Sequence, residues 1–232
     1  MANLEPLIQS IPVAPLKLAS LEGCRTLADQ VNNYLVSFRH ESPTNVGQAD
    51  SLQGYCADSY LLECECPRFG SGEGKGVLKE SVRGCDLFIM VDVTNYSLTY
   101  RVNGYENHMS PDNHYQDLKR IISAADGKAR RINVIMPFLY EGRQHKRSKR
   151  ESLDCALMLQ ELVDMGVSNI LTFDAHDPRV SNSIPLHGFD SFMPTYQFLK
   201  ALVNSVPDFV IDNDHLMIIS PDEGAMGRAV YF

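Results

Sequence analysis

Three short segments of the sequence gather side chains that can bind phosphate or a metal ion. The first is the basic segment GRQHKRSKR at 142–150, which holds Arg143, Gln144, His145, Lys146, Arg147, Lys149 and Arg150. The second is DAHD at 174–177, where Asp174, His176 and Asp177 place two carboxylates and an imidazole within four residues. The third is SPDEG at 220–224, which contains Asp222.

The basic segment suits a polyphosphate ligand. Arginine offers bidentate donors to phosphate oxygens, and lysine adds a point charge. Two other interpretations stay open, namely a solvated loop and a contact with an acidic partner subunit. An RNA-binding patch is a weaker fourth interpretation, because the whole chain is acidic.

The DAHD segment suits a magnesium site opposite such a phosphate loop. Mg²⁺ prefers oxygen ligands and keeps several waters, so Asp174 is a typical ligand and His176 a less typical one. Taken alone, His176 is more often a hydrogen-bonded structural residue. Asp222 is either a further oxygen ligand or the cap of a helix that GAMGRAVYF begins.

The elements around these segments predict an α/β fold. CDLFIMVDV (85–93) is a continuous apolar run typical of a strand buried on both faces. Further strands are predicted at 131–138, 169–177 and 215–224, and helices at 21–38, 110–127, 152–166 and 194–206, with a polar loop at 41–51. Ser110 and Ser152 are the predicted caps of two of these helices.

This alternation of strands and helices predicts a parallel sheet covered by helices on both sides. Ligands of open α/β sheets bind beyond the carboxyl ends of the strands. All three chemistry-bearing segments lie at the carboxyl ends of predicted strands or just beyond them. We therefore expect a magnesium-dependent enzyme that acts on a phosphorylated small molecule.

The glycine-rich stretch RFGSGEGKG (68–76) first suggests a phosphate loop, but the pattern fails. A Walker loop reads GxxxxGK followed by Ser or Thr. Here the spacing from Gly70 to Gly74 is one residue short, and Lys75 is followed by Gly76, which has no hydroxyl group. The stretch is better explained as a turn whose glycines serve backbone turning, because positive φ is cheap only in glycine.

Composition excludes several classes of protein. The 232 residues are 44% hydrophobic and 22% charged, a globular balance, and the net charge of -8 argues against a nucleic-acid binder. The amino-terminal stretch has neither a signal-peptide pattern nor a membrane span, so we expect a cytoplasmic protein. In LLECEC, Cys64 and Cys66 share one face of a strand, as buried reduced thiols or as metal ligands.

The blocks RFGSGE, KESVRGCDLFI, RINVIMPFLYEGRQHKRSKRES, ILTFDAHD and MIISPDEGAMGRA resemble, in this order, those of ribose-phosphate pyrophosphokinase. The resemblance covers residues 66–232. It implies a phosphoribosyltransferase-like (Rossmann-like) amino-terminal domain. It also implies that ATP, with Mg²⁺, gives its β,γ-diphosphoryl group to the 1-hydroxyl of ribose 5-phosphate, releasing AMP.

The resemblance also implies roles for single residues. Arg143 and Gln144 match the ATP-contacting pair, with His145 beside them. For the metal, His176 matches the magnesium-binding histidine, Asp222 the acidic residue at the metal and ribose, and Asp174 a neighbour acting through water.

The glycine stretch matches the hairpin that reaches the adenine of ATP in a neighbouring subunit. By this match Phe69 stacks on the adenine base or lines one side of it, and Glu73 accepts a hydrogen bond from the exocyclic amine. Ser71 lies between these two residues in the hairpin. A homo-oligomer with a shared ATP site follows from this match. The other interpretation of Phe69 and Glu73 is a simple surface turn.

Departures from the family pattern bear on activity. Ser71 and His145 stand where aspartates are usual, and Ala225 replaces a glycine. Residues 1–216 are expected to form the ATP-side domain, with 1–65 an unassigned extension, and 217–232 are expected to start a second domain. The family's catalytic lysine and arginine lie in that second domain, and no DDxxxTxxT-like segment occurs here.

We therefore expect little or no synthetase activity from these 232 residues alone. The alternative function is a non-catalytic, regulatory homologue that binds nucleotide or true synthetase subunits. A phosphoribosyltransferase is a weaker alternative, because it needs the ribose-phosphate loop.

Overall fold

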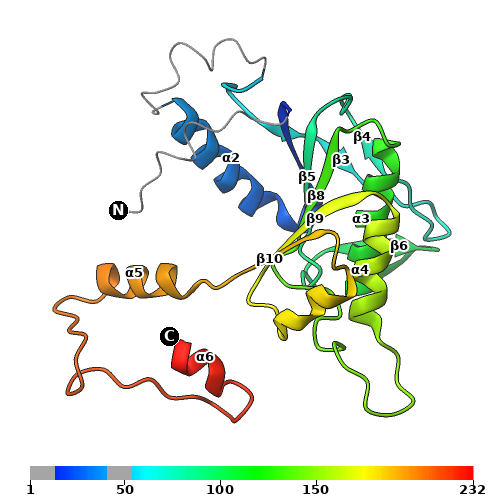
Figure 1. The fold of residues 1–232 in the computed structure, drawn as a ribbon. Helices are drawn as coiled ribbons and strands as arrows, with labels where there is room; N and C mark the ends of the chain where they lie inside the picture. Colours follow the sequence, from blue (N-terminus) through cyan, green and yellow to red (C-terminus); the bar gives the residue numbers. More distant parts are fainter. Residues whose placement is uncertain (1–13, 41–53, 232) are drawn as a thin grey trace. The chain divides into compact units, whose positions relative to one another are not determined.

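The computed structural model describes residues 14–40 and 54–231 (Figure 1). The polar loop predicted at 41–51 and the opening residues 1–13 lie outside the described ranges. The chain divides into two compact units, Met1–Ser191 and Phe192–Phe232. Each unit is described by itself, and the domain boundary predicted at 216 stays a prediction.

The first unit is built on a six-stranded sheet in the order β10-β9-β8-β5-β1-β2. Its strands are β1 (Leu16–Ser20), β2 (Leu61–Leu62), β5 (Asp86–Met90), β8 (Arg131–Ile135), β9 (Val167–Phe173) and β10 (Gly188–Phe192). The pairs β1·β2, β1·β5, β5·β8 and β8·β9 are all parallel. The predicted α/β class with a parallel sheet is confirmed.

Helices cover both faces of this sheet (Figure 1). The helices α3 (Pro111–Ala125) and α4 (Asp154–Asp164) lie on one face, and α2 (Arg25–His40), which follows the 3-10 turn η1 (Glu22–Cys24), lies on the other. The larger core joins the sheet to α3 and α4, through fully buried residues such as Leu87, Ile89, Leu118, Ile121, Val134, Leu159 and Leu162. Within the described residues, no helix is long and apolar enough to cross a membrane.

The start of α3 has the cap that the sequence predicts, Ser110. The Ser110 hydroxyl accepts a hydrogen bond from the Asn113 amide at 3.3 Å, and the Asn113 side chain accepts one from the Ser110 amide at 3.1 Å. This reciprocal capping box satisfies two backbone donors at the helix start. Pro111 occupies the first turn, where it loses no helical hydrogen bond.

We expect Ser110→Ala to lower the free energy of unfolding by about 1 kcal/mol, because an N-cap hydroxyl is lost. Chemical denaturation measures the change. Ser123→Ala is the matched control, since Ser123 is an exposed residue of the same helix whose only capping bond uses its backbone carbonyl and not its hydroxyl. Equal effects of the two substitutions would show that the cap contributes nothing.

The predicted cap of α4 is wrong. The residue before α4 is Leu153, which makes no side-chain capping bond. Ser152 lies one residue further out, and its hydroxyl donates to the Asp154 carboxylate. Its carbonyl oxygen accepts a bond from the Gln144 side chain at 2.7 Å, which holds Ser152 in the preceding loop.

The strand predicted at 215–224 is also wrong, because these residues form no strand. Met217 and Ile219 are 80% and 78% exposed. An apolar run becomes a strand only where a neighbouring strand pairs with its backbone, and no described residue does so here. The second unit instead holds α5 (Thr195–Ser205) and α6 (Met226–Tyr231).

Candidate functional site

The loops that follow β8 and β9 meet at the carboxyl ends of these neighbouring strands. The imidazole rings of His145 and His176 lie 5.1 Å apart between centroids. His145 Nε2 also lies 3.5 Å from Asp177 Oδ2. The structure therefore brings part of the basic segment and the DAHD segment together.

Gln144 shapes the base of the basic loop. Its side-chain nitrogen donates a hydrogen bond to the Ser152 carbonyl, and its backbone carbonyl accepts one from the Cys155 amide at 3.4 Å. These bonds tie the two ends of the loop together across the start of α4. The cationic side chains of the loop, at positions 143, 146, 147, 149 and 150, stay exposed.

The carboxylate of Asp177 is engaged by the protein itself. It accepts from the Arg179 backbone amide at 3.0 Å and from the Arg179 guanidinium, at the start of the 3-10 turn η4 (Pro178–Ser183). The Arg179 side chain holds the pKa of Asp177 well below its usual range. Asp177 is therefore a charged anchor of this loop and a fixed negative neighbour for His145.

The other DAHD residues differ in exposure. Asp174 is half-buried and His176 exposed, and Asp174 has a positive φ of 42° where the strand gives way to the loop. Asp222 belongs to the second unit, where its Oδ1 accepts from the Ala225 amide at 2.8 Å just before α6. This bond agrees with the second interpretation of Asp222 in the sequence analysis, that of a helix cap.

Among the described residues, no group of three His, Cys, Asp or Glu side chains is close enough to hold a metal ion. The β9 loop instead offers one carboxylate and one imidazole beside a row of cations. That donor set does not fit an all-protein metal cage. It is compatible with a divalent cation such as Mg²⁺ that keeps most of its ligands as water.

The glycine-rich stretch is the tip of an antiparallel hairpin formed by β3 (Cys64–Glu65) and β4 (Val77–Leu78). The Phe69 amide donates to the Glu73 carbonyl at 2.7 Å, and the Gly72 amide to the Phe69 carbonyl at 2.9 Å. Phe69 is 54% exposed, and the Ser71 hydroxyl donates to the exposed Glu73 carboxylate at 2.8 Å. The stretch is a hairpin tip and not a phosphate loop.

The expectation that its glycines serve backbone turning is correct for only one of the four. Gly72 has a φ of 91°, while Gly70, Gly74 and Gly76 have no positive φ. At Gly76, an added Cβ atom would lie 2.4 Å from the backbone oxygen of Arg120 in α3. Close approach to α3, and not turning, therefore requires glycine at this position.

Sequence reasoning missed a second hairpin, formed by β6 (Thr99–Val102) and β7 (Tyr105–His108). Its turn residues Asn103 and Gly104 have φ values of 50° and 87°, as Asn-Gly turns require. The Asn103 amide donates to the Gly70 carbonyl at 3.0 Å, so the second hairpin docks on the glycine hairpin. The Asn-Gly pair between two short runs was the available signal.

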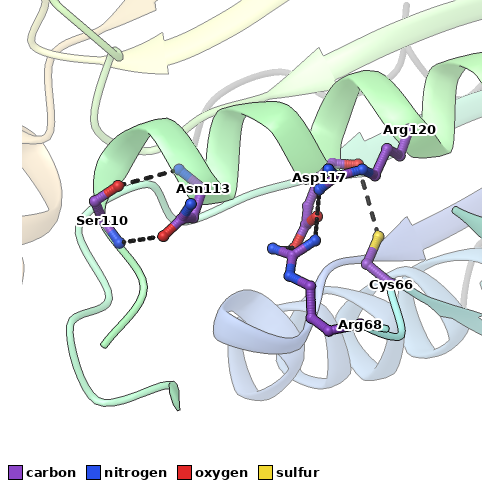
Figure 2. A network of polar contacts seen from close by, with 6 residues as sticks. All are labelled: Cys66, Arg68, Ser110, Asn113, Asp117 and Arg120. Carbon is purple, nitrogen blue, oxygen red and sulfur yellow. Dashed lines mark hydrogen bonds and ion pairs between the residues drawn. The ribbon is translucent and has the colours of Figure 1, made fainter. Parts of the chain in front are cut away.

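Beneath the glycine hairpin lies a buried ionic network, shown in Figure 2. Arg68 forms two bonds to the Asp117 carboxylate, at 2.6 and 2.9 Å, and Arg120 adds a third at 2.6 Å. The side chains of Arg68 and Asp117 are only 10% and 7% exposed. This network fixes the hairpin base to α3.

The thiols of Cys64 and Cys66 face the larger core on the same side of the strand. Burial raises the pKa of Cys64 to about 11, and burial together with the Asp117 charge raises that of Cys66 to about 12. Both are free cysteines. The structure favours the interpretation as reduced thiols, with Cys64 buried and Cys66 half-buried.

Comparisons with known proteins give a consistent result. Residues 16–166 match the family model described as the N-terminal domain of ribose phosphate pyrophosphokinase. A ribose-phosphate pyrophosphokinase of Corynebacterium ammoniagenes is 27% identical over 92% of this chain and 55% of its own length. One of Staphylococcus epidermidis is 28% identical over 73% of this chain and 48% of its own length.

The fold likeness extends to a solved structure. The crystal structure of phosphoribosylpyrophosphate synthetase from Mycobacterium smegmatis superposes with a TM-score of 0.62 at 21% identity, over 82% of this chain and 52% of the other. The chain thus spans about half the length of the proteins it matches. Its first unit has the α/β, phosphoribosyltransferase-like fold, and the chain belongs to the ribose-phosphate pyrophosphokinase family, through the N-terminal domain of that family.

Proposed function

We propose that the chain acts as the ATP-side part of a ribose-phosphate diphosphokinase. In this reaction the β,γ-diphosphoryl group of ATP is transferred to the 1-hydroxyl of ribose 5-phosphate, giving phosphoribosyl diphosphate and AMP. The observation that carries the proposal is the meeting of the two strand-end loops, with His145 and His176 at 5.1 Å. A row of exposed cations beside an imidazole and a carboxylate suits a metal-bound polyphosphate.

Arg143 and the lysines and arginines at 146–150 receive the phosphates in this proposal, because their side chains are exposed. Gln144 holds the loop closed through Ser152. Mg²⁺ would neutralise phosphate charge when bound, and His176 with Asp174 would contribute to holding it.

The exposed Phe69 ring and the nearby Glu73 carboxylate of one subunit contact the adenine of an ATP molecule that is bound in a neighbouring subunit. A half-exposed aromatic side chain at the tip of a rigid hairpin is suited to such a contact. The shared site makes the active form a homo-oligomer. We propose no role for nucleic acid or membranes.

Calorimetric titration with ATP and magnesium tests the nucleotide site. We expect His176→Ala to weaken MgATP binding by roughly tenfold, the loss of one charge-assisted interaction. His187→Ala is the matched control, because His187 is also exposed but lies just before β10. With magnesium removed by chelation, the wild type and His176→Ala are expected to bind ATP equally weakly. A His176→Ala variant that binds MgATP like the wild type contradicts the metal role.

A second function is a non-catalytic homologue that binds nucleotide or synthetase subunits. The contact of His145 with Asp177 favours it, because this imidazole faces a carboxylate of its own chain. Incubation with MgATP and ribose 5-phosphate separates the two functions. AMP formation that depends on ribose 5-phosphate, from this chain or when the second domain of a family synthetase is supplied with it, supports the enzyme. MgATP binding without AMP formation under both conditions supports the binding protein.

A further inference from the structure

A cavity of 440 Å³ lies at the carboxyl end of β1, away from the β8 and β9 loops. Its walls come from the β1–α2 connection, from β3 and the hairpin base, from β6, and from the first turns of α3. The lining residues that carry the argument are Glu22, Arg25, Glu65, Arg68, Tyr100 and Arg101. None of the lining residues belongs to the candidate nucleotide site.

The lining holds three arginines and three carboxylates, and two of these carboxylates also pair with cations outside the lining. Of its three carboxylates, Asp117 is bonded to Arg68 and also to Arg120, which lies outside the lining. Glu65 is paired with Lys79, also outside the lining, at 2.6 Å.

Two further guanidinium groups of the lining are those of Arg25 and Arg101. Arg25 also borders a neighbouring pocket that is lined by Asp29, Glu63 and Glu80. Arg101 lies opposite Glu106 across the β6·β7 hairpin, yet within the described ranges neither Arg25 nor Arg101 forms an ion pair. Two uncommitted arginines at one cavity are notable in a chain of net charge -8. They indicate an anionic ligand.

Part of the remaining lining is aliphatic or aromatic and suits a ligand with an apolar part, although Thr99 and His114 add polar groups. Leu21, Leu98 and Met109 contribute aliphatic surface, and Tyr100 contributes a ring. One face of this ring already carries the Arg68 guanidinium, 5.3 Å from its centroid, so the ring is held in place. A cavity of this size lies within the range of small-molecule sites, about 300–1,000 Å³.

We propose that this cavity binds a small phosphate monoester that carries a flat apolar group. Arg25 and Arg101 receive the phosphate, and Tyr100 with the aliphatic lining receives the flat group. The proposal is independent of the proposed nucleotide site, because the two share no residue. A dianionic phosphate is preferred to a carboxylate, since two guanidinium groups offer it several parallel donors.

Calorimetry with phenyl phosphate tests this proposal, since this probe has neither a nucleobase nor a polyphosphate. We expect phenyl phosphate to bind at least about tenfold more tightly than inorganic phosphate or benzoate, each of which lacks one half of the recognised chemistry. Arg25→Gln and Arg101→Gln are each expected to weaken its binding by about tenfold, as for a lost charge-assisted bond. Arg101→Lys is expected to fall between Arg101→Gln and the wild type.

Two variants make the test specific. Tyr100→Ala is expected to remove the preference for phenyl phosphate over inorganic phosphate while leaving phosphate binding unchanged. Arg147→Gln, in the exposed basic loop, is the matched control and is expected to leave phenyl phosphate binding unchanged. Absence of binding overturns the proposal, as does binding that Arg147→Gln weakens and Arg25→Gln and Arg101→Gln do not. Circular dichroism confirms that each variant is folded.

Discussion

Replacing Asp117 by alanine is expected to lower the free energy of unfolding by about 3–5 kcal/mol. The carboxylate is 7% exposed and accepts three bonds, two from Arg68 and one from Arg120. Its removal leaves two guanidinium groups, 10% and 22% exposed, without their counter-charge. Leaving buried charges unpaired costs more than the pair itself contributes, which is why the expected effect is large.

Urea denaturation of the wild type and of Asp117→Ala measures this difference. Asp164→Ala is the matched control, since Asp164 is an exposed aspartate at the end of α4 and is expected to change stability by less than about 0.5 kcal/mol. Asp117→Asn keeps the volume and removes the charge, so a large loss in that variant assigns the effect to electrostatics. A loss below about 1 kcal/mol in Asp117→Ala would show that water solvates the two arginines.

The elements that the sequence predicted well are those whose own residues decide their structure. The run at 85–93 is apolar at nearly every position, and the structure buries it in the middle of the sheet as β5. The helix at 110–127 carries its own cap in Ser110 and its own stop near Gly127, and α3 has both. Such local signals are independent of the rest of the chain.

β1 and the strand wrongly predicted at 215–224 depend on distant partners. β1 is a five-residue strand in the least regular part of the sequence, and its place in the sheet is set by parallel pairing with β5 and β2. The apolar run at 215–224 has the composition of a strand but lacks a pairing neighbour among the described residues. Composition alone does not distinguish these two cases.

The candidate site is predictable in outline and not in contact detail. Ligands of open α/β sheets bind at the carboxyl ends of the strands, so the sequence alone predicts that the basic loop and DAHD lie at the same edge of the sheet. The contact of His145 with His176 and Asp177 depends on side-chain packing between two loops that are distant in sequence. The bond by which Gln144 closes its own loop depends on the path of the folded backbone. The cavity beside β6 was not predicted, because the β6·β7 hairpin that forms one of its walls was missed.

Gly76→Ala is expected to lower the free energy of unfolding by about 2–3 kcal/mol, as overpacking against a rigid neighbour does. The new Cβ atom would lie 2.4 Å from the Arg120 oxygen and 2.5 Å from its carbonyl carbon, both backbone atoms of α3. Neither can rotate away, so the hairpin and the helix must separate. That movement also strains the bonds of Arg68 and Arg120 to Asp117, which join the same two elements.

Two further alanine variants of the same hairpin decide between turning and close approach as the reason for its glycines. At Gly70 an added Cβ meets nothing within 4 Å and φ is not positive, so Gly70→Ala is expected to be neutral. Gly72→Ala is expected to cost about 1–2 kcal/mol, because an L-residue is strained at a φ of 91°. Its added Cβ would also lie 2.9 Å from Val102 Cγ2, which is a side-chain atom and not a backbone atom. If turning dominated, Gly72→Ala would be the most destabilised of the three in urea denaturation. The structure instead predicts that Gly76→Ala is the most destabilised of the three variants, because a backbone clash relaxes less easily than a strained dihedral angle.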